Sequence, residues 1–278
     1  MQGDDMANDR VEIRSDVVFG TGNGHDLRCD VYVPPGAETR RPAVLLVHGG
    51  GWRQGEKEQL RGYGIRLGRS GYVCVLTQYR LVGESAWPAQ VQDVKAALRW
   101  MRANAEELGL DPDRVALQGH SAGAHIVLFA AGTPNVAEYE GDGGNPGVST
   151  SVDAVIGVYP PTRFYLGPRQ HGGVPIEALS DDPTKELAES ASPVNVAGPE
   201  FPPTMLMHGN ADKVVPVSAS FLMYETLTKH KVPTELHVFA EAEHGFDADP
   251  TFGRRTAELI VLFLERYLKE RTQAPASD

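Results

Sequence analysis

A serine flanked by two glycines is the first residue in this chain that could do covalent chemistry. Residues 119–123 read Gly-His-Ser-Ala-Gly, the spacing G-x-S-x-G, with Ser121 at the centre. An apolar run ending at Gln118 leads into this pentapeptide, and the helix-favouring run Ala122–Ala131 follows it. This strand–turn–helix context is typical of a nucleophile elbow, in which a strained serine backbone exposes Oγ. Ser121 is therefore the candidate nucleophile; the alternative is a serine that only caps the helix.

Three consecutive glycines at positions 49–51 follow another apolar run, Pro42–Val47. Glycine N–H groups have no side chain in the way, so they can reach the oxyanion of a tetrahedral acyl-transfer intermediate. We predict that the N–H groups of Gly50, Gly51 and Ala122 form an oxyanion hole; the alternative is a flexible turn. A phosphate-binding P-loop is excluded because Glu56 stands where its lysine must be.

A serine nucleophile needs a neutral imidazole to accept its proton and a carboxylate to orient that imidazole. His244 lies in the loop between the last predicted strand and the last predicted helix. Asp212 follows the predicted strand Thr204–His208 closely. The resulting chain order Ser121, Asp212, His244 is the order used by α/β-hydrolases. We therefore predict a Ser–His–Asp catalytic triad.

Other histidines and acids fit these two roles less well. His48 precedes the serine, on the wrong side for this chain order, and is expected to brace the glycine loop. Glu243 and Asp247 flank His244, but a carboxylate so close in sequence rarely reaches back to its own histidine. The other histidines considered for the base are expected to pack or to lie away from the site: His125, His171, His208, His230 and His237.

Apolar runs and helical patterns alternate along most of the chain, after an opening hairpin formed by Val17–Phe19 and Leu27–Val33. This alternation predicts an α/β fold with a mostly parallel sheet and helices on both faces. The expected strands are Pro42–Val47, Val73–Thr77, Val115–Gln118, Ala154–Val158, Thr204–His208 and Glu235–Phe239. The expected helices are Leu60–Ser70, Ala89–Ala105, Ala122–Ala131, Val217–His230 and Thr251–Lys269.

Two stretches interrupt this alternation. Residues 132–151 are rich in Gly, Pro and Asn and are expected to form a surface loop. Residues 160–203 are too long for an ordinary connection and contain a short helical pattern near Thr184–Ser190. We interpret them as a small lid, because long excursions from the carboxyl end of a strand usually cover the site there. The whole chain is expected to be one domain, with tails at 1–10 and 272–278.

Composition excludes several classes of protein. The chain has 278 residues and a formal net charge of −11, so nucleic acid and anionic membranes are poor partners. No apolar run approaches the ~18 residues of a membrane helix, and the polar first fifteen residues lack the apolar core of a signal peptide. Cys29 and Cys74 are expected to be buried free thiols, and no metal site is expected. We expect a cytoplasmic protein.

The motifs together resemble a known family. Residues 48–52 (His-Gly-Gly-Gly-Trp), 79–81, 87–90, 111–115 and 119–123, with the later His208-Gly-x-x-Asp212 and Glu243-His-Gly-Phe246, resemble α/β-hydrolases of the acetylxylan/feruloyl esterase-like group. This group is close to the hormone-sensitive-lipase-like carboxylesterases. The resemblance covers roughly residues 17–268 and implies hydrolysis of carboxylic esters without a cofactor.

We therefore predict a serine carboxylesterase for small, short-acyl, largely uncharged esters. The alternatives are a formamidase, a lactonase or a small-peptide hydrolase on the same triad, and, from another class, a non-catalytic binding protein of the same fold. The expected partner is a small-molecule ester, and the prediction leaves a homodimer open. Six aromatic residues are expected in the pocket wall or, equally, in the core: Trp52, Tyr79, Trp87, Phe164, Tyr165 and Phe246.

Overall fold

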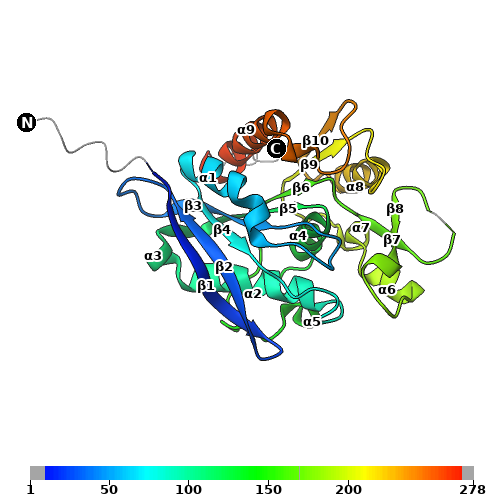
Figure 1. Ribbon diagram of the computed structural model, residues 1–278, viewed down its shortest axis with the longest axis horizontal. Coiled ribbons are helices and arrows are strands. Elements are labelled where there is room, and N and C mark those ends of the chain that lie inside the picture. Colours follow the sequence, from blue (N-terminus) through cyan, green and yellow to red (C-terminus); the bar gives the residue numbers. More distant parts are fainter. Residues whose placement is uncertain (1–9, 169, 271–278) are drawn as a thin grey trace, which may run out of the picture.

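The computed structural model describes residues 10–168 and 170–270 and centres on one eight-stranded sheet (Figure 1). The strand order is β1-β2-β4-β3-β5-β6-β9-β10. Strand β1 pairs with β2, and β2 with β4, in antiparallel fashion, whereas every neighbouring pair from β4 to β10 is parallel. The predicted architecture, a mostly parallel sheet with an antiparallel hairpin at its N-terminal edge, is confirmed.

The strands of this sheet follow the predicted apolar runs, with shifted ends. Their bounds are β1 Glu12–Gly22, β2 His25–Val33, β3 Arg41–Val47, β4 Val73–Thr77, β5 Leu110–His120, β6 Ala154–Val158, β9 Thr204–Gly209 and β10 Thr234–Phe239. The strand β5 begins earlier than predicted because Leu110 pairs with Arg41 before a register shift. The hairpin is also longer than the predicted apolar runs. Its first strand lies at the edge of the sheet and is largely exposed, so it contains polar residues that a search for apolar runs misses.

Helices cover both faces of the sheet. The longer ones are α1 Arg61–Arg69, α2 Ala89–Ala103, α4 Ala122–Gly132, α8 Ser218–Lys229 and α9 Pro250–Leu264, and the short ones are α3 Ala105–Leu108, α5 Ala137–Glu140, α6 Lys185–Ser190 and α7 Pro193–Val196. The 3-10 segments are η1 Lys57–Leu60, η2 Ile176–Ala178 and η3 Phe246–Ala248, and η4 Glu265–Lys269 is a π-helical segment that follows α9. The predicted helix Ala89–Ala105 is divided at Asn104, and the predicted loop 132–151 contains α5.

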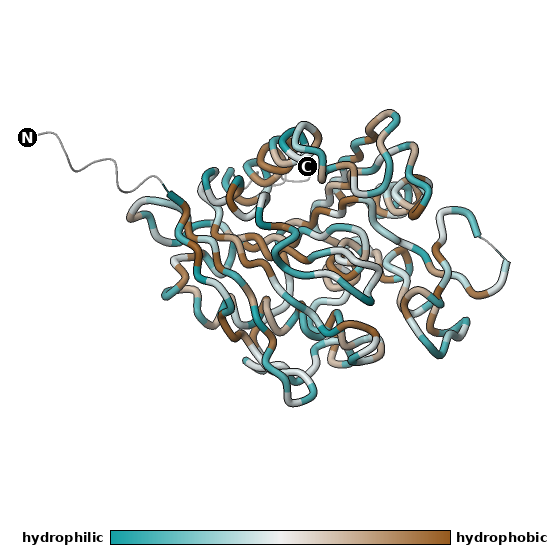
Figure 2. The backbone as a smooth tube through the Cα atoms, viewed as in Figure 1, coloured by the Kyte–Doolittle hydropathy of each residue, from teal (hydrophilic) through white to brown (hydrophobic). Residues whose placement is uncertain are grey.

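Two hydrophobic clusters lie on opposite faces of the sheet, because successive side chains of a strand point to opposite sides. One cluster joins alternate strand residues such as Leu45 and Leu117 to α2, α4 and α8. The other joins Leu46 and Ala116 to α1 and α9. Hydrophobic segments of the chain accordingly gather in its interior (Figure 2). Cys29 and Cys74 are buried and unpaired, as predicted.

The segment 160–203 lies at one edge of the molecule (Figure 1). It contains the two-stranded sheet of β7 Arg163–Tyr165 and β8 Gly173–Pro175, followed by η2, α6 and α7. The helix α6 falls on the predicted helical pattern, and the side chain of Thr184 caps it by accepting a hydrogen bond from the Leu187 N–H.

Candidate active site

Ser121 lies at a sharp turn between β5 and α4. Its backbone has φ 53° and ψ −118°, a conformation that L-residues rarely adopt. The turn is held in place because the Ser121 N–H donates to the Val158 carbonyl at 2.9 Å. It also requires a glycine at 123, since a Cβ there would lie 2.2 Å from the Val47 carbonyl oxygen. The sequence thus folds into the strained turn that exposes the serine hydroxyl.

The three residues predicted as a triad lie in hydrogen-bonding contact. The Ser121 Oγ is 2.9 Å from His244 Nε2, and His244 Nδ1 is 2.7 Å from Asp212 Oδ2. Asp212 is the fully buried member, and His244 is about one-fifth exposed. Because Nδ1 faces a carboxylate, it carries the imidazole proton, which leaves Nε2 free to accept the proton of Ser121.

Asp212 is held by several donors at once. Its Oδ1 accepts the N–H groups of Val214 at 2.8 Å and Val215 at 2.9 Å. Burial by itself would raise the pKa of Asp212, but hydrogen bonds from His208 and His244 outweigh it and hold that pKa well below its usual range. Asp212 is therefore an ionised carboxylate at neutral pH.

His208 is a residue whose contact with Asp212 the sequence did not reveal. It is buried at the end of β9, as expected for a packing residue, but its Nε2 lies 3.3 Å from Asp212 Oδ2 and 3.0 Å from the Val215 carbonyl. The Ser220 hydroxyl, 2.7 Å from Nδ1, donates to it. A histidine four residues before the acid could have signalled this contact, because both lie at the same strand end.

The glycine loop reaches the same cavity as Ser121. Gly50 and Gly51 line that cavity and have positive φ angles of 120° and 61°. A Cβ on Gly50 would lie 1.9 Å from the Gln54 carbonyl oxygen, so no other residue fits there without a rearrangement. Ala122 is the first residue of α4, where a backbone N–H has no partner within the helix. Gly50 and Gly51 thus lie at the cavity of Ser121 and Ala122 directly follows that serine, while the oxyanion hole itself stays a prediction.

His48 braces the glycine loop. Its Nδ1 donates to the Gly49 carbonyl at 2.7 Å, and its ring stacks on Tyr79 with a centroid distance of 4.4 Å. The Tyr79 hydroxyl in turn donates to the His48 carbonyl at 3.2 Å. Burial lowers the pKa of His48. The residue is therefore a neutral support of the loop, as predicted.

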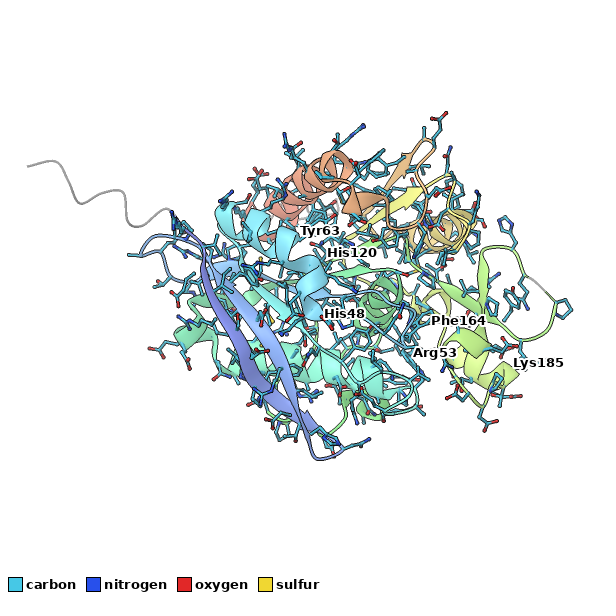
Figure 3. All side chains as sticks on the ribbon, viewed as in Figure 1. His48, Arg53, Tyr63, His120, Phe164 and Lys185 are labelled. Atoms are coloured by element: carbon cyan, nitrogen blue, oxygen red, sulfur yellow. The ribbon has the colours of Figure 1, made fainter. Side chains whose placement is uncertain are left out.

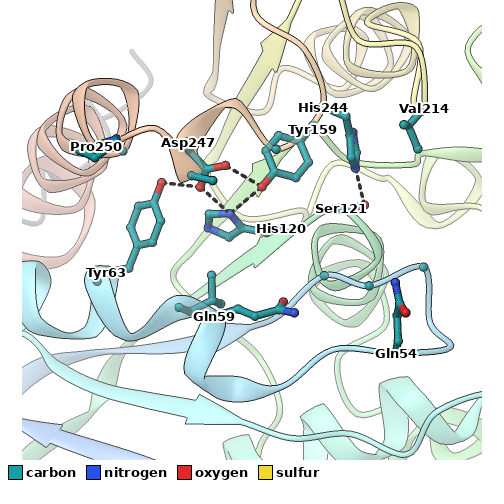
Figure 4. A pocket seen from close by; sticks show the side chains of 18 of the residues that line it. Gln54, Gln59, Tyr63, His120, Ser121, Tyr159, Val214, His244, Asp247 and Pro250 are labelled. Carbon is teal, nitrogen blue, oxygen red and sulfur yellow. Dashed lines mark hydrogen bonds and ion pairs between the residues drawn. The ribbon is translucent and has the colours of Figure 1, made fainter.

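The two acids next to His244 point elsewhere. Glu243 forms an exposed ion pair with Lys213 at 3.5 Å. Asp247 is buried and binds His120, Tyr63 and Tyr159 (Figure 4). Asp212 is thus the carboxylate that the structure places on His244.

A cavity of about 860 Å³ opens at Ser121 and His244. Its lining includes polar side chains, among them Gln54, Gln59 and Arg66. Such a volume lies within the range of small-molecule binding sites. Other lining residues are Tyr63, His120, Tyr159, Val214, Asp247 and Pro250 (Figure 4).

None of the six aromatic residues expected in the pocket wall is among those that line this cavity. Five of them are buried, and Trp87 packs against the core. All of them except Tyr165 pack their rings on other aromatic or imidazole rings, as core residues do. Trp52, Phe164 and Trp87 surround His125, Tyr79 stacks under His48, Tyr165 lies in β7, and Phe246 packs on Phe239 and Tyr159.

The segment 160–203 contacts the glycine loop. Arg53 forms an ion pair with Asp181 at 2.7 Å, and the ring of Phe164 packs on Trp52 at 5.5 Å (Figure 3 labels Arg53 and Phe164). Among its described residues, none lines the cavity at Ser121. The segment therefore lies against the residues that follow the glycine loop, and its role as a lid stays a prediction.

One group of three carboxylates among the described residues has metal-ligand spacing: Asp16, Asp30 and Glu58. The ammonium group of Lys57 lies within 2.6–3.4 Å of all three. Because the Lys57 ammonium already contacts all three carboxylates, this group does not suggest a metal centre.

Comparison with known proteins identifies the family. The BD-FAE family model matches residues 29–227. The chain belongs to this family. It is 32% identical to esterase LipC of Mycobacterium tuberculosis over 84% of its own length and 60% of that protein, and 30% identical to esterase LipQ over 90% and 61%. The chain thus spans about three-fifths of the length of these relatives.

Solved structures show the same α/β-hydrolase fold. Thermogutta terrifontis esterase 2 phosphoramylated by tabun superposes with a TM-score of 0.78 and 28% identity, covering 94% of this chain and 97% of that one. A truncated carbohydrate esterase from gut microbiota gives a TM-score of 0.81 at 22% identity, covering 94% and 99%, and shows the fold alone. Within residues 10–168 and 170–270, no helix is long and apolar enough to cross a membrane.

Proposed function

We propose that this BD-FAE family protein is a serine carboxylesterase that works through an acyl-enzyme at Ser121. Two consecutive hydrogen bonds carry the proposal. One joins Ser121 Oγ to His244 Nε2 at 2.9 Å, and the other joins His244 Nδ1 to Asp212 Oδ2 at 2.7 Å. These are the distances that a general base needs for proton transfer and orientation. The names of the relatives, which include several esterases, support the same activity.

Acylation begins when His244 Nε2 takes the hydroxyl proton of Ser121 and Oγ bonds to the ester carbonyl carbon. The carbonyl electron pair moves to oxygen, and the N–H groups of Gly50, Gly51 and Ala122 stabilise the resulting oxyanion. The bond to the alkoxy group then breaks, and the proton on His244 Nε2 passes to the departing alcohol. The ionised Asp212 stabilises the imidazolium that forms between these two transfers.

Deacylation repeats these transfers with water. His244 takes a proton from the water, whose oxygen bonds to the acyl carbon, and the same N–H groups hold the second oxyanion. When the bond from the carbon to Oγ breaks, Oγ recovers the proton from His244. The products are a carboxylic acid and the free enzyme, so no cofactor is needed.

The proposed substrates are small, short-acyl and largely uncharged esters. Structures of Thermogutta terrifontis esterase 2, 26% and 28% identical to this chain, are described as bound to butyrate and to propionate, which favours short acyl groups. The net charge of −11 disfavours anionic substrates. We also propose that the chain forms one domain, in which segment 160–203 acts as a small lid beside the glycine loop. A homodimer is a further proposal, which a measurement of the molecular mass in solution would test.

The test compares Ser121→Ala with wild type. A fluorophosphonate probe should label the wild-type protein at Ser121 and fail to label the variant, and kcat on p-nitrophenyl acetate should fall by roughly 10⁴ to 10⁶. Ser190→Ala, at an exposed serine on α6, is the matched control and should keep full activity. If Ser121→Ala keeps more than about a tenth of the activity, Ser121 is not the nucleophile. A panel of esters, N-formylkynurenine and lactones separates an esterase from a formamidase or a lactonase.

A further inference from the structure

Four buried polar side chains from four separate segments meet beside the proposed triad (Figure 4). Asp247 is the centre of this cluster. Its Oδ2 accepts from the Tyr63 hydroxyl at 2.8 Å and lies 3.0 Å from His120 Nδ1, and its Oδ1 accepts from the Tyr159 hydroxyl at 2.7 Å. The side chains of His120 and Asp247 are only 4% and 7% exposed, so these bonds are shielded from water. We call these four residues the Asp247 cluster.

The hydrogen bonds assign the protons in this cluster. His120 Nδ1 faces the Asp247 carboxylate at 3.0 Å, which can only accept, so Nδ1 carries a proton, while Nε2 lies 3.1 Å from the Gln118 side-chain amide. This Nδ1–H donates to Asp247 and, at 3.2 Å, also faces the Tyr159 hydroxyl oxygen. Both tyrosine hydroxyls therefore give their protons to Asp247, and neither is left to donate to a substrate.

The carboxylate of Asp247 is ionised in this environment. Burial by itself would raise its pKa, but His120 and the two tyrosine hydroxyls outweigh that effect and hold the pKa well below its usual range. A buried anion with three donors is a rigid junction, because breaking any one bond leaves a charged group without full compensation.

The cluster is joined to the proposed triad at both ends. His120 immediately precedes Ser121 at the strained turn, and Asp247 lies three residues after His244. Tyr159 reaches the triad through its ring, whose centroid is 4.6 Å from that of His244. The segment that carries the nucleophile and the loop that carries the base are thus tied together by side chains.

We propose that Asp247 is a positioning residue that clamps the nucleophile turn to the base-bearing loop and so maintains the contact between Ser121 and His244. The inference rests on the proposed function. Asp247 fixes the segment that carries Ser121 through its contact with His120. It fixes the position of His244 through its hydrogen bond with Tyr159. The ring of Tyr159 also packs on the ring of His244, with the two ring planes tilted by 57°.

This arrangement predicts a specific kinetic signature. Proton transfer requires the two heavy atoms to stay within hydrogen-bond distance, and a displacement of about 1 Å can lower a rate by on the order of 10²-fold. Loosening the clamp should therefore slow acylation much more than it weakens substrate binding, because the cluster members, although they line the cavity, have no free donor for the substrate. The same loosening should slow the attack of Ser121 on a small phosphonate.

The experiment uses Asp247→Asn and Tyr159→Phe, with Tyr72→Phe as the matched control. Tyr72 is buried on the same face of the sheet, and its hydroxyl has no hydrogen-bond partner among the described residues. Each protein is checked for folding by circular dichroism and thermal unfolding. The kcat and KM for p-nitrophenyl acetate and the rate of inactivation by a fluorophosphonate are then measured per titrated active site, so that unfolded protein does not count.

We expect Asp247→Asn to lower kcat and the inactivation rate by roughly 10- to 100-fold, and Tyr159→Phe by about 10-fold, with KM within about twofold of wild type. The double variant should lose less than the product of the two single losses, because both changes open one clamp. Tyr72→Phe should match wild type.

Three outcomes overturn the inference. If both variants keep kcat and the inactivation rate per titrated site, the cluster only stabilises the fold. If KM rises while kcat is unchanged, its members bind substrate instead. If Asp247→Asn costs as much as Asp212→Asn, Asp247 orients the base directly. Should Asp247→Asn fail to fold, Tyr159→Phe alone decides, since it removes one hydroxyl and keeps the ring. A wild-type protein that the phosphonate does not label at Ser121 would reject the proposed function instead.

Discussion

His125 provides a test of how the core supports the glycine loop. It is completely buried in α4, where its Nδ1 accepts from the Trp52 indole N–H at 3.1 Å and its Nε2 donates to the Ala191 carbonyl at 2.9 Å. Burial lowers its pKa from 6.5 to about 4, partly offset by the Ala191 carbonyl. Protonation would place a second N–H against the indole N–H of Trp52, two residues after Gly50. We predict that acidification below about pH 6.5 destabilises the protein through this residue.

The sign and size follow from proton linkage. The folded-state pKa lies below the unfolded one, so between about pH 4 and 6.5 the unfolded chain binds more protons, and the free energy of unfolding falls as the pH falls. Because one pKa unit corresponds to about 1.4 kcal/mol, the full effect is about 3 kcal/mol, of which about 2 kcal/mol is lost by pH 5. A loss of this size is a large share of the stability of a typical domain.

The assay compares wild type with His125→Gln, whose amide can accept from Trp52 and donate to Ala191 but does not titrate. Urea unfolding is followed by tryptophan fluorescence and by circular dichroism from pH 7.5 to pH 5, under conditions where refolding is complete. The unfolding free energy of wild type minus that of the variant should fall by about 2 kcal/mol as the pH is lowered from 7.5 to 5. His25→Gln, at an exposed position, is the matched control for loss of a histidine.

A difference that stays constant over this pH range would refute the reasoning. So would a His125 ring that titrates above about pH 6 in an NMR experiment, since burial would then not disfavour its charged form as argued.

Three further predictions concern the site. Asp212→Asn should lower kcat by roughly 10³ to 10⁴, because His244 loses its orienting acceptor, and it should lower kcat more than Asp247→Asn does. The reverse ranking in steady-state kinetics would mean that Asp247, and not Asp212, orients His244. Acyl chains of about two to six carbons should be preferred, since each further methylene gains only ~0.8 kcal/mol and only where it can be buried; kcat/KM still rising at decanoate would contradict this. Gly123→Ala should yield little folded protein, because its Cβ would lie 2.2 Å from the Val47 carbonyl oxygen and 2.4 Å from that of His48; a variant with the wild-type thermal midpoint would show that the turn can relax.

The sequence alone predicted the features that depend on local pattern and chain order. The nucleophile turn is signalled by the glycines on either side of Ser121. The positive φ of Ser121 requires a tight turn, and a Cβ at position 123 would collide with the Val47 carbonyl, so few other residues are tolerated there. The alternation of apolar runs predicted the parallel sheet, since buried strands and amphipathic helices have different periods. The order of Ser121, Asp212 and His244 then placed each residue at the carboxyl end of a strand, where parallel strands bring such residues together.

Only the tertiary structure decided the contacts between residues that are distant in sequence. Apolar aromatic side chains suit a core and a pocket wall equally well, so packing alone determined that Trp52 and Phe164 surround His125 and do not line the cavity. The Asp247 cluster was equally invisible, because its hydroxyl donors lie 88 and 184 residues away along the chain. A hydrogen bond depends on distance and direction in space, and nothing in the local sequence encodes which buried donor will meet an isolated carboxylate.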